Sequence, residues 1–504
     1  MEHTDIVIVG AGLSGIGTAH HLRDKCPGKR FVILESRHAI GGTWDLFRYP
    51  GVRSDSDMHT LGYSFKPWRE AKAIADGPSI LRYVNEVAVE DRTHEHIRFG
   101  HRVTGAAWSS ATATWTVEAE RVETGETVRF TCNMLLMCGG YYRYDRAYDP
   151  GFEGLEDFRG TVVHPQFWPQ DLDYAGKRVV VIGSGATAMT LVPAMAGKAA
   201  EVVMLQRSPT YVVSWPEQDK VANRLRRFLP EKLAYAITRW RNVRKDQSFY
   251  RRTRVEPKKV KAELIGGVRA ELGDDYDVET HFTPRYNPWD QRLCLVPDSD
   301  LFVAIRSGKA SVVTDTIAGF SAGGIRLASG RELPADIIVT ATGLELAVLS
   351  GVSLVVDGAP VNLPDVWNYK GMMYSDVPNL VQTFGYINAS WTLRADLTAE
   401  YTCRLINRMD ERGVTICVPR LREQDRAMPV RPWIDDFPAG YMQRAMHLLP
   451  RQGDRDPWRH TQNFDEDRRL VRDSPIDDDV LHFGNPAVAE PVAAIGMRSQ
   501  AAAR

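Results

Sequence analysis

The sequence predicts an α/β fold with two similar βαβ units, and three observations lead to this prediction. Apolar runs of strand length at Asp5–Val9 and Arg178–Ile182 each end in a glycine-rich turn, and a helical stretch follows each turn. A third apolar run, Ala335–Gly343, ends in small residues. Strands that alternate with helical stretches are typical of doubly wound α/β folds. With 504 residues, the chain is long enough for two or three domains.

The first unit carries a glycine motif in a specific context. Gly10, Gly12 and Gly15 follow the first strand and open a helix, and the second strand, Arg30–Leu34, is followed directly by Glu35. Glycines at this spacing let the backbone approach a pyrophosphate, which the N-terminus of the helix then binds. An acidic side chain at the end of the second strand can accept hydrogen bonds from a ribose. We therefore expect a Rossmann-like dinucleotide site here.

The second unit has a related pattern with a different strand end. Gly183, Gly185 and Ala188 form its turn, and alanine is a permitted variant in the third position. Its second strand ends in Arg207 and Ser208 instead of an acid. A carboxylate there would repel a 2′-phosphate, whereas a guanidinium and a hydroxyl bind one. The pattern favours NADPH over NADH; the alternative for Arg207 is a solvated charge at a strand end.

Together the two units indicate FAD at the first site and NADPH at the second. One large class of proteins with this plan reduces disulfides and needs a close cysteine pair beside the flavin. The sequence has Gly41-Gly42-Thr43-Trp44 at that place, so this class is excluded.

Composition and charge exclude other classes. The net charge of −1 gives no overall attraction to nucleic acid. The six cysteines form no C-x-x-C pair and no zinc spacing, so we expect no metal site and a reducing compartment. The first strand begins at Asp5, which leaves no room for a secretion signal, and no apolar stretch is long enough to span a membrane. These observations predict a cytoplasmic protein.

Residues 220–262 differ from the rest of the chain, because 15 lysines and arginines stand against three acidic residues, a local charge of +12. Leu233, Ile237 and Trp240 fall at helical spacing behind Glu231, which predicts one amphipathic helix within a helical insertion. The basic face is either the solvated side of a helical subdomain or a peripheral contact with an anionic membrane.

Several motifs resemble the Baeyer–Villiger monooxygenase family, and the resemblance covers nearly the whole chain. The fingerprint of that family is similar to Phe158-x-Gly160-x-x-x-His164-x-x-x-Trp168-Pro169, and further motifs are Gly41-Gly42-Thr43-Trp44, Tyr49-Pro50-Gly51 with Asp55, and Asp336 with Ala341-Thr342-Gly343. Residues 286–293 and 385–393 bring the chain closest to the ethionamide-activating group of this family.

The resemblance implies roles for individual residues. Arg292 is the implied active-site arginine beside the flavin, and Asp55 orients it. The implied contacts of FAD, besides the three glycines of the first turn, are Ser14, Glu35, Thr43, Trp44, Asp45, Leu46, Asp55 and Val103. The implied contacts of NADPH are Gly183, Ser184, Gly185, Ala186, Thr187, Ala188, Met189, Arg207 and Ser208. Many members carry a lysine before the active-site arginine; Gln291 stands there instead, so Arg207 must provide more of the selectivity for NADPH.

The resemblance also implies a reaction with small-molecule partners. NADPH reduces FAD, and reduced FAD adds O2 to form a C4a-peroxyflavin. The peroxide attacks a ketone to give an ester or lactone, and Arg292 stabilises the anions. Oxidation of sulfur in thioethers or thioamides is the expected second activity. The alternatives are a flavin-containing monooxygenase restricted to nitrogen or sulfur, which Trp168 and Arg292 disfavour, and a flavoprotein that carries electrons or binds membranes.

The expected architecture follows from the order of these motifs. Residues 1–145 and 345–504 should form the FAD-binding domain, and residues 146–344 the NADPH-binding domain with a helical insertion at about 215–280. His164 and Trp168 are expected in the interdomain linker, where they order the nicotinamide domain without taking part in the chemistry.

Overall fold

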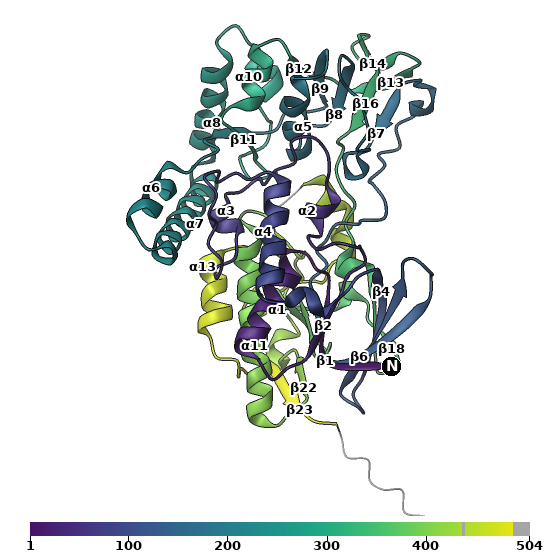
Figure 1. Cartoon of the computed structure of the whole chain (residues 1–504), viewed down its shortest axis with the longest axis vertical. Helices are drawn as coiled ribbons and strands as arrows, with labels where there is room; N and C mark the ends of the chain where they lie inside the picture. Colours follow the sequence, from purple (N-terminus) through teal and green to yellow (C-terminus); the bar gives the residue numbers. More distant parts are fainter. Residues whose placement is uncertain (436–438, 487–504) are drawn as a thin grey trace, which may run out of the picture.

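The computed structural model describes residues 1–435 and 439–486, and it contains two large sheets at opposite ends of the long axis (Figure 1). The first sheet has the order β18-β17-β4-β5-β6-β1-β2-β3, and β21 also pairs with β6. Its strands are β1 (Glu2–Val9), β2 (Phe31–Leu34), β3 (Ile97–Arg98), β4 (His101–Ser109), β5 (Thr114–Arg121), β6 (Thr127–Met137), β17 (Ser353–Val356), β18 (Ala359–Pro360) and β21 (Leu380–Gln382). The strands β4, β5 and β6 form an antiparallel extension of this sheet.

The second sheet has five parallel strands in the order β12-β9-β8-β16-β7. These are β7 (Thr161–Val163), β8 (Arg178–Ile182), β9 (Glu201–Gln206), β12 (Ala310–Thr314) and β16 (Ile337–Thr340). Strands that are covered on both faces are rich in valine and isoleucine, as these are. A small antiparallel sheet follows, formed by β13 (Ile317–Ser321), β14 (Gly324–Leu327) and β15 (Glu332–Pro334). The predicted α/β fold with two βαβ units is confirmed.

Helices cover both sheets and position the loops of the site. The principal ones are α1 (Leu13–Lys25), α4 (Gly77–Glu90) and α11 (Trp391–Arg412) on the first sheet, and α5 (Ala186–Ala196) and α10 (Asp300–Arg306) on the second. Asp76 begins α4 by accepting a hydrogen bond from the backbone N–H of Ser79 at 2.8 Å, which satisfies one of the free donors of the first turn. Gly413, in the left-handed conformation, ends α11.

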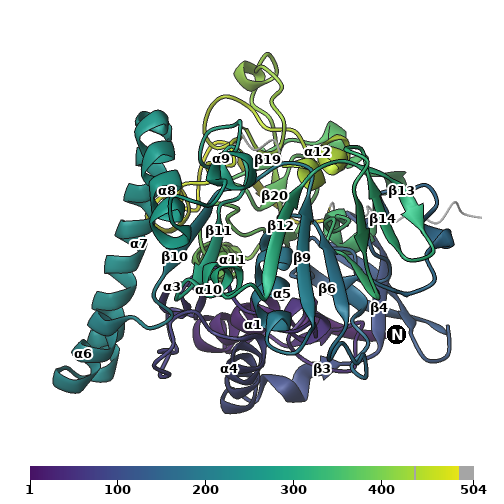
Figure 2. The same ribbon diagram turned by 90° about the horizontal axis from the view of Figure 1, so that it is seen from above.

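The helical insertion contains four helices, which are α6 (Lys220–Phe228), α7 (Glu231–Val255), α8 (Pro257–Leu272) and α9 (Val278–Phe282). The helix that the sequence predicts behind Glu231 is α7. Pro230 and Pro257 separate the helices, because proline starts a helix more readily than it continues one. The predicted apolar stripe of Leu233, Ile237 and Trp240 lies on the exposed side of α7. Figure 2 shows α6 and α7 at the edge of the molecule.

The opposite face of α7 packs against the first part of the chain. It contacts α3 (Met58–Leu61), and the hydroxyl of Tyr235 donates to the carbonyl of Tyr63 at 2.9 Å. Arg239 donates to the carbonyls of His59 (2.9 Å) and Gly62 (2.7 Å), so one of the basic side chains anchors α7 to the segment around α3. Within the described ranges, no helix is both long and apolar enough to cross a membrane.

Two chain segments connect the first sheet with the second, one around residues 142–146 and one around residues 345–346. These two connecting segments run antiparallel to each other. Tyr142 pairs with Leu346 in an isolated bridge, and the N–H of Arg143 donates to the carbonyl of Glu345 at 2.8 Å. The carboxylate of Glu345 accepts from Arg143 (3.1 Å) and from Arg146 (2.7 Å). The remaining elements near the carboxyl end include α12 (Gly440–Ala445), α13 (Phe464–Asp467), β19 (Asn368–Tyr369), β20 (Met373–Tyr374), β22 (Ile416–Pro419) and β23 (Leu481–Gly484).

Candidate active site

The first glycine turn leaves the N-terminus of α1 open for a ligand. Gly10 has a φ of 100°, and a Cβ there would lie 2.8 Å from the Cα of Gly139, so only glycine fits. Gly12 is the N-cap residue and offers no side chain to the free N–H groups of the first turn. A group with negative charge, such as a pyrophosphate, would be stabilised at this position. The local backbone therefore fits a dinucleotide.

Glu35 lies at the end of β2, next to this turn. Its carboxylate accepts from the backbone N–H groups of Ala11 (2.7 Å) and Arg37 (2.8 Å). Burial raises the pKa of Glu35, and these hydrogen bonds partly oppose that rise. The carboxylate is held rigidly beside the first turn, as a ribose acceptor would need to be.

The other residues that the sequence assigns to FAD gather around the same helix end. The N–H of Gly41 donates to the carbonyl of Ala11 at 3.0 Å, which brings the loop before α2 (Thr43–Leu46) against the glycine turn. Trp44 and the buried Leu46 follow on α2. Val103 is buried in β4, which begins where the N–H of His101 donates to the carbonyl of Glu35 at 2.9 Å.

Three of these residues already have partners within the protein. The hydroxyl of Ser14 accepts from Trp391 Nε1 (2.8 Å), and Thr43 Oγ1 lies 3.0 Å from the hydroxyl of Tyr144. The buried carboxylate of Asp45 forms ion pairs with Arg37 (2.5 Å) and Arg48. The side chain of Asp45 is therefore engaged in shaping the loop around α2.

The second glycine turn has the same open geometry. Gly183 has a φ of 134°, and a Cβ there would lie 2.3 Å from the carbonyl oxygen of Ala341. Gly185 is the N-cap residue of α5, without a side-chain cap and with open space around its Cα, while Ala186 is exposed. The buried Ala188 and Met189 hold the helix on the sheet. The N-terminus of α5 therefore fits the pyrophosphate of a second dinucleotide.

The strand end beside this turn is basic and solvent-exposed. Ser184 Oγ donates to the carbonyl of Ser208 at 3.1 Å, so the turn and the pair Arg207–Ser208 are neighbours. Arg207 is exposed, and no carboxylate of the described residues pairs with it. Thr187 lies close to Tyr49, whose pKa burial raises to about 12. Tyr49 thus links the first part of the chain to the second nucleotide turn.

Arg292 and Asp55, 237 positions apart in the sequence, meet in an ion pair of 2.6 Å. Arg292 directly precedes the buried pair Leu293–Cys294, the start of β11 (Cys294–Pro297), which pairs with β10 (Val212–Trp215). The hydroxyl of Tyr286 donates to Thr210 at 3.0 Å and holds the loop in front of Arg292. Burial alone would lower the pKa of Arg292, but Asp55 and nearby tyrosines outweigh burial and raise it. Arg292 is a permanent cation with 31% of its side chain exposed.

The sequence did not single out the tyrosines around this pair. Tyr141, Tyr142 and Tyr441 surround Arg292, and the hydroxyls of Tyr141 and Tyr142 lie 3.0 Å apart. Tyr141 stacks on Trp391 with a centroid distance of 5.3 Å. Burial raises the pKa values of all three tyrosines, so their hydroxyls stay protonated at neutral pH. The sequence feature that could have indicated Tyr141 and Tyr142 is the cluster of tyrosines shortly after β6.

The fingerprint residues lie between the two sheets. The hydrogen bonds of this region lead to Gly343 and Arg143 and not to the Arg292–Asp55 pair. His164 Nε2 lies 3.3 Å from the carbonyl of Gly343, and Gln166 Nε2 donates to the carbonyl of Arg143 at 2.7 Å. Burial lowers the pKa of His164, so its imidazole is neutral at neutral pH. Trp168 is buried against the core of the second sheet. These contacts tie β7 to both connecting segments.

The chain is similar to known flavin-dependent monooxygenases. Residues 4–261 match the family model described as flavin-binding monooxygenase-like. The FAD-containing monooxygenase EthA of Mycolicibacterium smegmatis is 53% identical over 483 residues, which cover 96% of this chain and 97% of the relative. The protein of the same name from Mycobacterium tuberculosis is 52% identical, with coverage of 96% and 98%. A solved structure of an oxidised steroid monooxygenase bound to NADP aligns with a TM-score of 0.76 at 22% identity, covering 96% of this chain and all of that one, and shows a common fold.

Proposed function

This chain belongs to the flavin-binding monooxygenase-like family, and we propose on that basis that it is an FAD-dependent monooxygenase of the Baeyer–Villiger type. Its coenzyme is NADPH, and its substrates are ketones, which it converts with O2 to esters or lactones. Oxidation of sulfur in thioethers or thioamides is the second activity. The structural observation that best supports the proposal is the ion pair of Arg292 with Asp55, which tyrosine side chains surround.

When bound, FAD and NADPH supply the reducing equivalents and activate the oxygen. Arg292 holds a fixed positive charge where the oxygen of a ketone gains negative charge during attack. A preorganised charge of this kind contributes about 3–4 kcal/mol to the stabilisation of a transition state. Because the carboxylate of Asp55 lies 2.6 Å away, it orients the guanidinium and balances its charge before the substrate binds.

The tyrosine hydroxyls add neutral hydrogen-bond donors to the same place. Tyr142 lies near both Arg292 and Asp55, and its raised pKa keeps its proton in place. The stacked rings of Tyr141 and Trp391 present apolar surface beside these donors. Such a wall excludes water, which would otherwise divert activated oxygen to hydrogen peroxide.

The purified FAD-loaded protein tests the proposal. With NADPH, O2 and a simple aliphatic ketone, wild type should form an ester, measured by gas chromatography with mass detection. Arg292→Ala should keep FAD, consume NADPH and release hydrogen peroxide, yet form ester at least ~100-fold more slowly. Arg420→Ala, a change at an exposed arginine after β22, is the control. Ester formation by Arg292→Ala at the wild-type rate would remove Arg292 from the mechanism.

The same assay distinguishes the proposed Baeyer–Villiger activity from the alternative function that is restricted to nitrogen or sulfur. A flavin-containing monooxygenase confined to nitrogen or sulfur would oxidise thioanisole to the sulfoxide and form no ester from any of a series of ketones. Ester formation by wild type therefore decides between the two chemistries.

We further propose that α6 and α7 contact an anionic membrane surface. The side chains of Phe228 and Trp240 are 76% and 63% exposed. In the part of the chain that the structure describes, Lys220, Arg224 and Arg227 have no carboxylate partner. Exposed aromatic rings beside free cations are typical of helices that lie at a membrane interface, and each cation near the surface contributes about 1 kcal/mol.

Sedimentation with vesicles that contain anionic lipid tests this contact. Wild type should sediment at low salt and be released at high salt, and the double variant Arg224→Gln/Arg227→Gln should bind more weakly. Wild type that stays in the supernatant at low salt would make the basic side of the insertion a solvated surface.

A further inference from the structure

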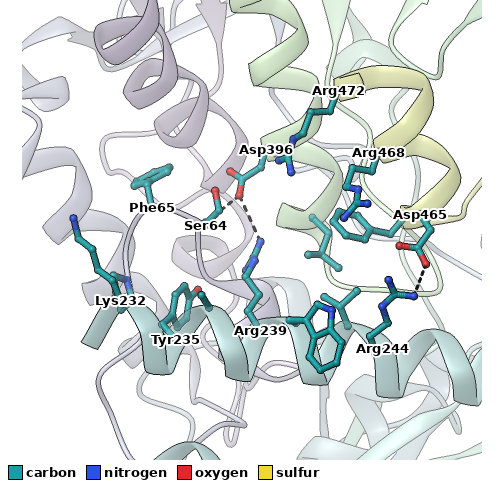
Figure 3. A pocket seen from close by; sticks show the side chains of 16 residues that line it. Ser64, Phe65, Lys232, Tyr235, Arg239, Arg244, Asp396, Asp465, Arg468 and Arg472 are labelled. Carbon is teal, nitrogen blue, oxygen red and sulfur yellow. Dashed lines mark hydrogen bonds and ion pairs between the residues drawn. The ribbon is translucent and has the colours of Figure 1, made fainter. Parts of the chain in front are cut away.

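A cavity of about 510 Å³ lies between the helical insertion and the carboxyl-terminal part of the chain (Figure 3). One wall is α7, the floor comes from residues 64–67 and the first turns of α11, and the far wall is α13 with the helical turn that follows it. Its volume falls within the range of about 300–1,000 Å³ that is typical of small-molecule sites. None of the residues assigned to FAD, NADPH or the Arg292–Asp55 pair lines it.

The side chains that line the cavity form an apolar part and a basic part. Along α7, Lys232, Ala236, Trp240 and Arg244 follow at intervals of four residues, which places them on one face of the helix. On the far wall, Phe464 and Arg468 are also four residues apart. Figure 3 shows Arg244, Arg468 and Asp465 together at one end of the cavity, with Phe65 and Lys232 at the other.

The charges at the basic end are incompletely neutralised. Arg244 pairs with Asp465 at 3.4 Å, and Arg472 pairs with Glu400 at 2.6 Å. In the described part of the chain, Arg468 forms its ion pair with Asp473 at 4.0 Å, the limit of an ion pair. Arg468 is therefore the most weakly paired of these three guanidinium groups and is available to a negative charge from a ligand.

The aromatic rings in the apolar part of the cavity are partly exposed to solvent. Trp240 lines the cavity with 63% of its side chain exposed. Phe65 and Phe464 are only partly buried. Leu393 and Val243 also line the cavity. A flexible hydrocarbon chain along these rings would remove apolar surface from water, at a gain of about 25 cal/mol for each Å² buried.

We propose that this cavity binds a long-chain carboxylate, with the carboxylate on Arg468 and Arg244 and the hydrocarbon chain along Trp240 towards Phe65. A guanidinium binds a carboxylate in a bidentate, charge-assisted geometry. The ligand would bridge α7 of the insertion and the carboxyl-terminal part of the chain, and so would stabilise their contact. This site is separate from the one that carries out the proposed reaction, and the proposal does not depend on that activity.

Isothermal titration calorimetry of the full-length FAD-loaded protein tests the site, with dodecanoate and dodecan-1-ol as probes below their aggregation limits. Wild type should bind dodecanoate at least ~10-fold more tightly than dodecan-1-ol, since one charge-assisted hydrogen bond is worth more than the ~1.4 kcal/mol that this factor represents. Arg468→Gln should remove the preference and leave binding of dodecan-1-ol unchanged. Trp240→Ala should weaken both probes, and the distant control Arg420→Gln neither.

Three results would overturn the proposal. Equal affinity of wild type for both probes would show that the cations do not recognise the ligand. Unchanged binding of dodecanoate to Arg468→Gln and Trp240→Ala would place the ligand elsewhere. Loss of dodecanoate binding in Arg292→Ala would place it in the catalytic site. A rise in the Tm of wild type with dodecanoate, absent in a folded Arg468→Gln variant, would support the proposed site.

Discussion

Arginines in this protein differ in function because their surroundings differ. Arg292 is partly enclosed, has a carboxylate 2.6 Å away and lies among tyrosines. Arg239 donates hydrogen bonds to backbone carbonyls of the segment around α3. Arg207 is exposed at the end of β9, and within residues 1–435 and 439–486 it pairs with no carboxylate. An exposed cation beside an open helix N-terminus is suited to a phosphate.

The exposed position of Arg207 leads to a prediction about coenzyme choice. Arg207→Ala should raise the KM for NADPH by about 10- to 150-fold, because a charge-assisted hydrogen bond contributes roughly 1.5–3 kcal/mol. The KM for NADH should stay nearly constant, since NADH lacks the 2′-phosphate. Steady-state kinetics with both coenzymes measure this. Arg326→Ala, an exposed arginine on β14, serves as control; equal effects of Arg207→Ala on both coenzymes would refute the assignment.

At the scale of elements, the short helix α13 presents two carboxylates in opposite environments. Asp467 is 3% exposed, pairs with Arg394 at 2.8 Å and accepts from the hydroxyl of Tyr386 at 2.7 Å. Asp465 pairs with Arg244 at 3.4 Å on the surface. The buried pair holds the loop before Trp391, whereas the surface pair is exposed to solvent.

Asparagine substitutions on α13 should therefore differ greatly in effect. Asp467→Asn should lower the free energy of unfolding by about 3–5 kcal/mol, because it leaves the guanidinium of Arg394 buried without a counter-charge. Asp465→Asn should cost about 0–1 kcal/mol. Thermal and denaturant unfolding measure both variants. A loss of similar size in both would mean that burial of the Arg394–Asp467 pair does not determine its contribution.

The helix α7 contains a carboxylate whose titration should be visible in stability. Burial, helped by the nearby charge of Asp57, raises the pKa of Asp246 to about 7. The unfolded chain loses this proton near pH ~3.9, but the folded protein keeps it until about pH 7. The folded state binds more protons in this window, so this group lowers stability as the pH rises through it.

Asp246→Asn should remove this pH dependence. The variant and wild type should have similar Tm values near pH ~3, where Asp246 is mostly protonated in both states. Near pH 8 the variant should melt higher, by roughly 1 °C for each kcal/mol that is regained in a chain of this length. Differential scanning calorimetry across this range provides the test, and a variant that is less stable than wild type at pH 8 would contradict it.

At the scale of the whole molecule, the two connecting segments determine how the sheets are joined. Glu345 binds both Arg143 and Arg146, and these arginines lower the pKa of its carboxyl. Glu345→Gln should loosen the segments and raise the rate of tryptic cleavage after Arg143 and Arg146 by up to about fivefold, the effect of roughly 1 kcal/mol. Limited proteolysis followed by mass spectrometry measures the rate. Glu118→Gln, which breaks a surface pair with Arg129 on the first sheet, should have no such effect.

Much of this FAD-containing monooxygenase could be predicted from local sequence. The glycine turns, the strands before them and the ends marked by Glu35 and by Arg207 depend on residues close together in the chain, so their pattern is readable. The motifs also named Arg292 and Asp55. The domain boundaries near residues 145 and 345 stay a prediction, as do the roles of the individual contacts of FAD and NADPH.

The sequence by itself determined the two βαβ units, whereas the order of their dinucleotides and the assignment of Arg292 as the active-site arginine stay predictions. Only the tertiary structure decided that Tyr141 and Tyr441 lie close to Arg292 and that the apolar stripe of α7 faces outwards. The physical reason is distance along the chain. Periodicity reports which side of a helix is apolar, but which surface covers that side depends on contacts between residues hundreds of positions apart.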